Sequence, residues 1–288
     1  MSLSPAIDLD EILKTAIEAA ERAAVIARQQ RDSLAVSVSF KADRNLVTTA
    51  DLACEKAIIE TIQERFPSHM ILAEESVGLT TPEACSSGPV WVIDPIDGTT
   101  NYAHGHYQVG ISIGFAVDSV VQAGVVVAPF LGETFTAIKG RGAFCNGRPI
   151  TVSQAASIDD ALVCTGFPYK RGNIANICAR LERILERCRD VRRLGAASLD
   201  ICWVACGRLD AFYEETLNPW DIAAGGLIAR EAGARMGHFP YDCESQKVAH
   251  QYSGDLFADN LIVSAPGCYN DIEQALASCV GKAAPKQA

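Results

Sequence analysis

The hydrophobic pattern of the chain changes once, near residue 150, and this change limits the folds available to it. Before it, two amphipathic stretches precede a run of short apolar segments that follow one another closely. After it, short apolar segments alternate with helical stretches. Closely spaced strands favour an antiparallel sheet, whereas strands separated by helices need crossover connections and favour a more parallel one. We therefore expect an α+β part over residues 1–150 and an α/β part over residues 151–288.

The first part is expected to contain two helices packed on a largely antiparallel sheet. One helix spans about residues 8–31, with Asp8 and Glu11 at capping-box spacing. The other spans about residues 51–66 and ends before Pro67. Asn146-Gly147 predicts a tight turn. The strands are predicted at Met70–Ala73, Val90–Asp94, Val109–Val117, Val120–Ala128 and Glu133–Ile138.

The second part is expected to alternate strands with helices. The strands are predicted at Leu162–Thr165, Val191–Leu194, Asp210–Glu214 and Leu261–Ser264. The helices are predicted at about Ile174–Cys188, Ser198–Cys206, Trp220–Ala232 and Tyr269–Cys279.

Charge and composition exclude several classes of protein. The formal net charge is −10 and no block of basic residues occurs, which argues against a nucleic-acid surface. The longest apolar run is interrupted and falls short of the roughly 20 residues of a membrane helix. The N-terminal stretch lacks the pattern of a secretory signal, and the 11 cysteines are scattered without a CxxC pair. We expect a cytoplasmic protein with reduced thiols.

The segment from Trp91 to Asn101 carries the densest chemical signal. An apolar strand leads into Asp94, Pro95 bends the chain, and Asp97 follows before Gly98. Two carboxylates at a strand end suit a hard cation such as Mg²⁺, and backbone N–H groups at a following helix start suit phosphate. A turn with surface aspartates is the alternative, and it explains Asp97-Gly98 alone at least as well.

Other acids stand at comparable places. Glu74 and Glu75 end a predicted strand, Asp51 begins a predicted helix, and Asp221 lies in the first turn of another. A plain helix cap explains Asp51 as well as any function does, and the helix dipole alone favours an acid at Asp221. The joint occurrence of these acids carries more weight than any one of them.

Four strings of residues resemble the inositol monophosphatase family in order and spacing. They are Leu46-Val47-Thr48-Thr49-Ala50-Asp51, Ala73-Glu74-Glu75-Ser76, Asp94-Pro95-Ile96-Asp97-Gly98-Thr99-Thr100-Asn101 and Trp220-Asp221-Ile222-Ala223-Ala224-Gly225. The resemblance covers nearly the whole chain. It implies a layered αβαβα sandwich, usually a homodimer, that hydrolyses phosphomonoesters with Mg²⁺ and is often inhibited by lithium.

The resemblance also implies a set of metal ligands. Glu74, Asp94 and the backbone carbonyl of Ile96 would bind a first ion. Asp94, Asp97 and Asp221 would bind a second, and Glu74 would help with a weaker third. Two unit charges 4 Å apart repel by about 4 kcal/mol at an effective dielectric constant of 20, so such acids need cations between them. We therefore expect two to three Mg²⁺ ions.

Catalytic roles follow from the same resemblance. Thr99, paired with Glu74, would orient and deprotonate the attacking water, with Asp51 next to Thr99. Asp97, Gly98 and Thr99 would contact the phosphate, and Glu75 would be a supporting acid.

The resemblance places the rest of the substrate against a second set of residues, which comprises Gly195, Ala197, Glu214 and Asp221. Glu214 would accept hydrogen bonds from ring hydroxyls in preference to its neighbour Glu215. Lys41 is a candidate basic residue of a loop ahead of Asp51.

The chain departs from the family pattern at two places. Tyr102 replaces the usual Phe, and His106-Tyr107 replaces a Phe-Pro-like pair. Neither touches an expected ligand, so these changes bear on substrate preference and packing. Histidines without a partner acid at ligand spacing are usually solvent contacts, and we assign no metal to His104 or His106.

Three hypotheses for function remain. The first is a Mg²⁺-dependent phosphatase that hydrolyses inositol monophosphate to inositol and phosphate with a metal-activated water. The second keeps the fold and chemistry for histidinol phosphate, fructose 1,6-bisphosphate or a 3′-phosphoadenosine nucleotide. The third is a non-catalytic regulatory protein on the same fold, which loss of a metal carboxylate would indicate, and none is missing. The small phosphomonoester is the expected partner, with neither nucleic acid nor membrane.

Overall fold

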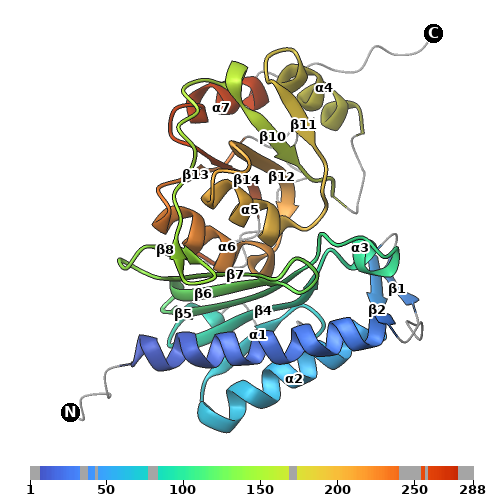
Figure 1. Cartoon of the computed structure of the whole chain (residues 1–288), viewed down its shortest axis with the longest axis vertical. Helices are drawn as coiled ribbons and strands as arrows, with labels where there is room; N and C mark the ends of the chain where they lie inside the picture. Colours follow the sequence, from blue (N-terminus) through green and yellow to red (C-terminus); the bar gives the residue numbers. More distant parts are fainter. Residues whose placement is uncertain are drawn as a thin grey trace.

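The computed structural model describes residues 7–32, 38–42, 45–76, 84–168, 174–239, 254–256 and 259–277. Its helices and strands form five layers, in the order helices, sheet, helices, sheet, helices (Figure 1). This is the αβαβα sandwich that the resemblance to the family implied. No helix among the described residues combines the length and the apolar character that crossing a bilayer requires.

The first sheet has seven strands, and its spatial order follows the sequence. They are β3 (Met70–Ala73), β4 (Pro89–Asp97), β5 (Gly110–Val117), β6 (Val120–Ala128), β7 (Glu133–Ile138), β8 (Ala143–Cys145) and β9 (Arg148–Pro149). Only the β3–β4 pair is parallel, so the predicted largely antiparallel sheet is confirmed.

The second sheet has five strands. They are β10 (Leu162–Thr165), β11 (Asp190–Arg192), β12 (Ala211–Leu217), β13 (Arg235–Gly237) and β14 (Asp259–Ser264), in the spatial order β11-β10-β12-β14-β13. The β10 strand pairs in parallel with β11 and β12, whereas β14 is antiparallel to both β12 and β13. The expectation of a more parallel sheet therefore holds for three strands and is wrong for the other two.

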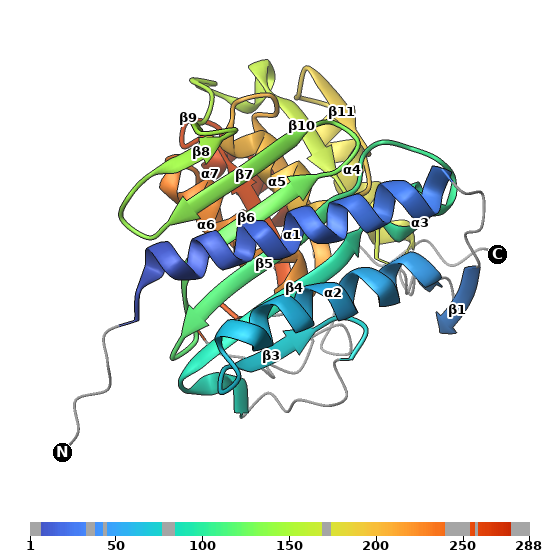
Figure 2. The ribbon, with the colours of Figure 1, turned by 60° about the horizontal axis from the view of Figure 1, so that its bottom comes forward.

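The helices form three layers around these sheets. The first layer is α1 (Leu9–Asp32) with α2 (Thr49–Arg65), and both cross the outer face of the seven-stranded sheet (Figure 2). The middle layer is α5 (Ala197–Ala205) with α6 (Pro219–Glu231), and the last is α4 (Ile174–Leu185) with α7 (Tyr269–Ala277). A short helix, α3 (Thr99–Ala103), follows β4, and a hairpin of β1 (Val38–Ala42) and β2 (Asn45–Thr48) precedes α2.

Strand β4 is buried on both faces, and this explains its continuous apolar run. Because side chains alternate along a strand, Trp91 and Ile93 face the core beneath α1 and α2. Val90 and Val92 face the core between the two sheets. Both cores consist of fully buried side chains. The strand that leads to the predicted acids is therefore among the most firmly held of the fold.

Two glycines bring α6 against the seven-stranded sheet. Gly114 on β5 lies opposite Gly124 on β6 in the register. A Cβ at Gly114 would lie 2.9 Å from the methyl group of Ala223, and one at Gly124 would lie 2.9 Å from the Cα of Ala224. The backbone of α6 thus approaches the sheet as closely as the absence of side chains allows. This contact sets the distance between α6 and the strands β5 and β6.

Five short strands were not predicted, because they lack the continuous apolar runs by which the equally short β3 and β10 were recognised. They are β1, β2, β8, β9 and β13. Residues 70–149 build the first sheet and residues 162–264 the second. That the two parts are separate domains, divided near residue 150, stays a prediction.

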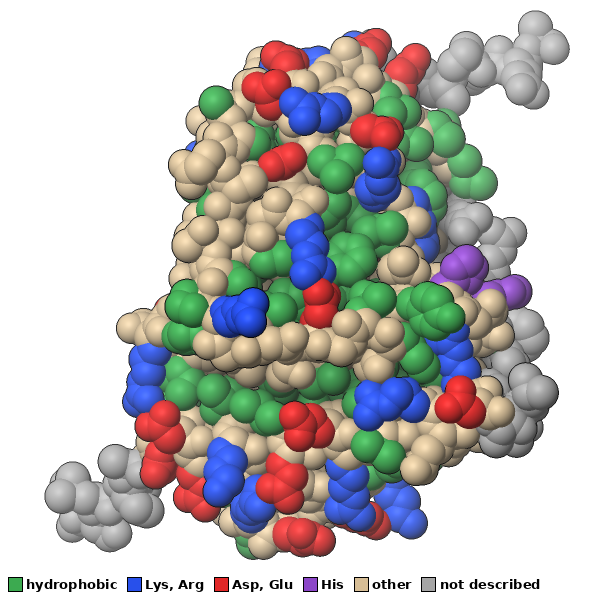
Figure 3. Space-filling model, viewed as in Figure 1, with side chains coloured by type: hydrophobic (Ala, Val, Ile, Leu, Met, Phe, Trp, Pro, Cys, Tyr) green, Lys and Arg blue, Asp and Glu red, His purple; other side chains and the backbone are tan. Residues whose placement is uncertain are grey.

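Acidic and basic side chains are interspersed on the face of the molecule drawn in Figure 3. Apolar side chains show between them, mainly over the middle layers.

Candidate active site

A β-bulge at the end of β4 places Asp94 and Asp97 together. In a regular strand, residues three apart point to opposite faces. Here Asp94 pairs with Ser112 and Asp97 with Gly110, so two residues of β4 stand against one of β5. Such a bulge bends the strand and redirects its side chains, and Pro95 within it donates no ladder hydrogen bond. The strand was predicted to end at Asp94, but it continues through the bulge to Asp97.

The first turn of α6 brings a third acid to the same place. Asp221 accepts a hydrogen bond from the backbone N–H of Asn218 at 2.7 Å, in a capping box that begins the helix. The buried Ser112 hydroxyl, on β5 opposite Asp94, donates to the carbonyl of Trp220 at 3.1 Å. This bond ties the first turn of α6 to the strand beside Asp94.

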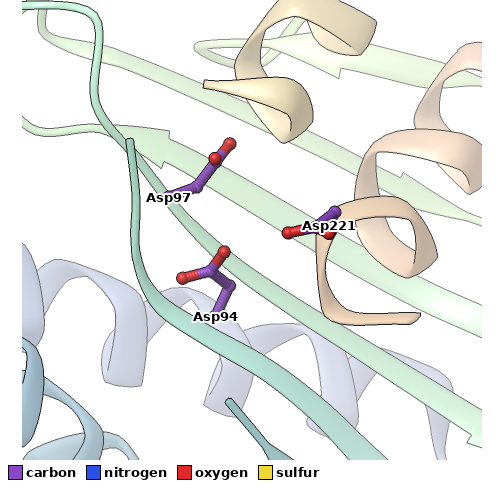
Figure 4. A group of neighbouring side chains, drawn as sticks. All are labelled: Asp94, Asp97 and Asp221. Carbon is purple, nitrogen blue, oxygen red and sulfur yellow. The ribbon is translucent and has the colours of Figure 1, made fainter. Parts of the chain in front are cut away.

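Asp94, Asp97 and Asp221 form one acidic group. Each offers a carboxylate oxygen, and the three oxygens all lie within 4.8 Å of one another. Figure 4 shows the side chains of Asp94 and Asp97 from β4 and of Asp221 from α6 around a common space. Asp94 is 1% exposed and Asp97 is 7% exposed. Residues more than a hundred positions apart in the sequence thus meet at one point between the two sheets.

Burial raises the pKa of all three acids, and repulsion by neighbouring acids adds to this for Asp94 and Asp221. For Asp94 the pKa lies well above its usual range because of burial first, and then because of the charges of Glu74, Asp97, Asp221 and Asp51. The pKa of Asp221 is raised well above its usual range by burial, then by Asp97 and Glu74. Without a cation the raised pKa values favour the protonated carboxyl groups. A bound divalent ion would lower these pKa values and favour the carboxylates.

Asp97 has a second task, because its carboxylate caps α5. It accepts hydrogen bonds from the backbone N–H groups of Ala197 at 3.1 Å and Ser198 at 2.7 Å, and from the Ser198 hydroxyl at 2.6 Å. Burial raises its pKa, whereas these hydrogen bonds act in the opposite direction. The acid of the first sheet is therefore held in place by a helix of the middle layer. Ala197, expected at the substrate, meets Asp97 through this bond.

Asp51 and Thr99 are joined by a hydrogen bond inside the protein. Asp51 is fully buried and accepts from the Thr48 backbone N–H at 2.8 Å, in the capping box of α2. Its other oxygen lies 3.1 Å from the Thr99 hydroxyl, which also lies 3.1 Å from the carbonyl oxygen of Ile96. Thr48, rather than Asp51, is the N-cap of α2. The interpretation of Asp51 as a plain N-cap is therefore wrong. Its carboxylate does take part in capping α2, from the third position of the helix, and it contacts Thr99 as well.

Glu74 follows β3 and lies beside β4, since its backbone N–H donates to the carbonyl of Ile93 at 3.1 Å. Its charge acts on Asp94 and Asp221, but it does not belong to the group of three oxygens within 4.8 Å. The Glu75 backbone N–H donates to the carboxylate of Glu55 at 2.8 Å.

The segment from Leu194 to Ser198 closes over the loop that follows Asp97. Gly98 adopts a left-handed conformation with φ of 86°, and a Cβ there would lie 3.0 Å from the carbonyl oxygen of Gly195. The Asn101 amide donates to the carbonyl oxygens of Leu194 and Gln108, both at 2.7 Å. Glycine at position 98 is therefore required both by conformation and by space.

Glu214 and Arg193 lie on the second sheet's side of the acidic group. Burial and the charge of Asp221 raise the pKa of Glu214 well above its usual range, and Arg193 acts against this shift. The carboxylate of Glu214 lies directly over Gly166. The guanidinium of Arg193 lies 5.6 Å from the ring centre of Phe167 and over Gly195.

The remaining expected residues lie elsewhere or make structural contacts. Lys41 is on β1, but its side chain lies outside the described part. His104 and His106 follow α3 as exposed residues, and the carbonyl of His106 accepts from Arg31 at 2.7 Å. The Tyr102 hydroxyl donates to the carbonyl of Ala27 at 2.8 Å and so ties α3 to α1.

Three residues at the site escaped the sequence interpretation. They are Ser198, Asn101 and Asp200. Asn101 stands within the motif and was named without a role, whereas Ser198 acts through a contact across 101 residues that no local pattern reveals. Asp200 is 1% exposed on α5, and burial, followed by the charge of Asp97, raises its pKa to about 8. A buried acid within an apolar helix is the one signal that pointed to it.

A surface groove of about 720 Å³ lies away from these acids. Its lining, within the described part of the chain, runs from Ala175 to Glu186, on α4 and just after its last residue. It is a helix face without ligating groups from any other element.

Comparison with known proteins gives a consistent answer. The sequence model of the inositol monophosphatase family matches residues 8–279. Inositol monophosphatase 1 of Solanum lycopersicum is 38% identical over 247 residues, which cover 84% of this chain and 90% of the relative. Nus factor SuhB of Pasteurella multocida is 37% identical over 276 residues, which cover 94% and 98%.

Solved structures share the fold. The extragenic suppressor protein suhB of Bartonella henselae superposes with a TM-score of 0.82 at 30% identity, covering 92% of this chain and 98% of that one. Sequence, fold and the group of buried acids thus point the same way. The chain belongs to the inositol monophosphatase family, whose members are metal-dependent phosphatases.

Proposed function

We propose that this protein hydrolyses a small phosphomonoester with the help of Mg²⁺, and that its substrate is inositol monophosphate. The observation that carries the proposal is the meeting of Asp94, Asp97 and Asp221, with one oxygen from each within 4.8 Å of the others. Holding three like charges this close costs stability unless a cation neutralises them. The name of the relative inositol monophosphatase 1 of Solanum lycopersicum supports the choice of substrate.

The donors fit a hard divalent ion. Every ligand that we propose is an oxygen, from Glu74, Asp94, the carbonyl of Ile96, Asp97 and Asp221. Oxygen ligands without nitrogen or sulfur are typical of Mg²⁺ and Ca²⁺ sites rather than zinc sites. The Ile96 carbonyl accepts one hydrogen bond from Thr99 and retains a second lone pair. These residues would hold the two to three ions that we propose.

Bound Mg²⁺ would supply a water of lowered pKa and a countercharge for the leaving oxygen. The protein's own contribution centres on Thr99. A hydroxyl has one proton, and that proton can point to Asp51 or to the Ile96 carbonyl. When it points to Asp51, the Thr99 oxygen can accept a hydrogen bond from the attacking water, which Glu74 orients. As that water gives up its proton to Thr99, the Thr99 proton passes to the Asp51 carboxylate. Asp97, Gly98 and Thr99 hold the phosphate.

The polyol would lie between the phosphate and the second sheet. Its neighbours would be Gly195, Ala197 and Asp221, and the Glu214 carboxylate would accept hydrogen bonds from its ring hydroxyls. An aspartate or glutamate accepts from two neighbouring hydroxyls at once, which is a common way to recognise a vicinal diol.

The decisive experiment is phosphate release from a panel of phosphomonoesters, with and without Mg²⁺. The panel contains inositol 1-phosphate, histidinol phosphate, fructose 1,6-bisphosphate and a 3′-phosphoadenosine nucleotide. We expect turnover only with the metal and the highest kcat/KM for inositol 1-phosphate. A tenfold or greater preference for another member would replace the substrate but keep the chemistry. Absence of metal-dependent phosphate release from every member would overturn the proposal.

Likeness to the family extends the proposal to lithium inhibition, a homodimer and a cytoplasmic location. Lithium added to the same assay and light scattering of the purified protein test the first two, and fractionation of cells tests the third.

A further inference from the structure

Three strands of the second sheet end beside the acidic group. The β10 strand pairs in parallel with β11 and β12, so their carboxyl ends lie at one edge of the sheet. Gly166 follows β10, Arg193 follows β11, and Glu214 lies on β12 next to Tyr213, which pairs with Thr165. Ligands of sheets of this kind bind beyond the carboxyl ends of parallel strands. The carboxyl ends of β10, β11 and β12, which we call the substrate edge, therefore lie where the proposed polyol is expected.

The carboxylate of Glu214 occupies the space that a side chain at position 166 would fill. A Cβ built on Gly166 would lie under 3.0 Å from both carboxylate oxygens and from the carboxyl carbon of Glu214. The backbone of Gly166 does not adopt a left-handed conformation, so an alanine would fit its φ angle without strain. Glycine at position 166 thus provides room for the carboxylate of Glu214, and a left-handed φ angle is not the reason for it.

A methyl group at position 166 would displace the Glu214 side chain rather than the backbone. The atoms that it would meet are the far end of a flexible side chain. The backbone of Glu214 is held by its pairing with Leu261 on β14. The carboxylate is therefore the part that yields, and the strand stays in place.

We propose that Gly166 is the positioning residue that seats the Glu214 carboxylate at the substrate edge, and that it thereby selects phosphomonoesters whose alcohol carries further hydroxyl groups. The proposal rests on the proposed function and deepens it. An alcohol without such hydroxyls gains nothing from this carboxylate. The preference for polyol phosphates over phosphates of alcohols without hydroxyl groups then depends on position 166 having no side chain.

The test compares a polyol phosphate with an aryl phosphate that has no hydroxyl groups. KM and kcat are measured for inositol 1-phosphate, or for the panel member turned over fastest, and for p-nitrophenyl phosphate. We expect Gly166→Ala to raise KM for the polyol phosphate at least tenfold more than KM for p-nitrophenyl phosphate. The kcat ratio of the two substrates should change far less, because the acids at the metal site are not displaced.

A double variant shows whether Gly166 acts through Glu214. If it does, Gly166→Ala should have little further effect on the polyol KM in a Glu214→Ala background, because the carboxylate is already gone. Gly237→Ala is the matched control. A Cβ there would overlap the Tyr269 hydroxyl, again the end of a side chain, on β13 at the far edge of the same sheet. It should leave the ratio of the two KM values unchanged.

Each outcome decides something. Equal rises in both KM values, or full additivity with Glu214→Ala, would overturn the role of Gly166 while leaving the phosphatase intact. A melting temperature of the Gly166→Ala protein far below that of Gly237→Ala would contradict the premise that the carboxylate yields. Wild-type protein that releases phosphate from neither substrate would overturn the proposed function itself.

Discussion

Thr99 has two hydrogen-bond acceptors and a single proton, and this sets an expectation for its removal. We predict that Thr99→Ala lowers kcat by about 10²- to 10⁴-fold, the range for loss of a proton-transferring group. The affinity for Mg²⁺ should change much less, because the Asp94, Asp97 and Asp221 carboxylates remain. Steady-state kinetics and calorimetric titration with Mg²⁺ measure the two effects. Thr99→Ser keeps the hydroxyl and should restore most of the activity, and equal losses in kcat and Mg²⁺ affinity would make Thr99 structural.

Asp94 is the most buried member of the acidic group, so its charge should be the most costly without metal. We predict that Asp94→Asn abolishes Mg²⁺-dependent turnover and leaves the metal-free protein as stable as the wild type or more so. The amide oxygen can still accept from the Ile96 backbone N–H, which lies 3.1 Å from Asp94 Oδ1. Turnover and thermal unfolding in EDTA are the measurements.

Asp159→Asn is the matched control, because Asp159 is exposed and its ion pair with Arg187 lies on the surface. Surface pairs of this kind contribute about 0–1 kcal/mol, so its effect on stability should be small and independent of Mg²⁺. Substantial turnover by Asp94→Asn would show that the metal ligands are assigned wrongly.

At the scale of elements, the contact between α6 and the sheet determines where Asp221 lies. Gly124→Ala would place a methyl group 2.9 Å from the Cα of Ala224, and a backbone cannot yield as a side chain does. We predict a loss of about 1–3 kcal/mol of stability, as for other overpacked cores, together with weaker Mg²⁺ binding. Urea unfolding and Mg²⁺ titration test both parts.

Gly226→Ala, on α6, is the control for Gly124→Ala, which lies on β6. Its Cβ would lie 3.1 Å from the terminal methyl of Met236, which is flexible, so both stability and Mg²⁺ affinity should be nearly preserved. If Gly124→Ala loses stability but keeps full Mg²⁺ affinity, the height of α6 does not control the site.

The same elements show how far sequence patterns reach. The apolar run before Asp94 predicted a strand, and the pattern after Trp220 predicted a helix. Both elements exist, because each pattern lies within its own segment, although the strand continues beyond its predicted end. The bulge at Pro95 and Ile96 was not predicted, since strict alternation would send Asp94 and Asp97 to opposite faces. The hydrogen bond of Ser198 to Asp97 joins residues 101 positions apart, and no local pattern encodes it.

The resemblance to a family supplied what the local patterns lacked. It named Glu74, Asp94, Asp97 and Asp221 as one set, and the structure brings three of them within 4.8 Å while Glu74 lies outside that group. It said nothing of Gly166, whose importance comes from the space beside Glu214. Antiparallel β14 was equally hidden, because strand direction depends on the path of the chain between elements.

At the scale of the whole molecule, folding brings the carboxylates of Asp94, Asp97 and Asp221 together between the two sheets. Their mutual repulsion lowers the stability of the folded state when no cation is bound. The pKa values of Asp94, Asp97 and Asp221 are raised in the folded state, so the folded protein binds more protons than the unfolded chain above about pH 4. The free energy of unfolding must then fall as the pH rises through these raised values. Asp200, with a pKa of about 8, extends this range towards pH 8.

We predict that the metal-free protein loses stability steadily between pH 5 and pH 8, and that saturating Mg²⁺ flattens or reverses this slope. The ion needs deprotonated carboxylates, so its binding strengthens as the pH rises, and one site at 100 times its Kd adds about 2.7 kcal/mol. Urea unfolding at four pH values, in EDTA and in Mg²⁺, measures both curves. In EDTA the Asp94→Asn variant should show a shallower slope than the wild type, since one of the raised acids is gone. A metal-free protein whose stability instead increased from pH 5 to pH 8 would mean that these acids do not repel one another in the fold.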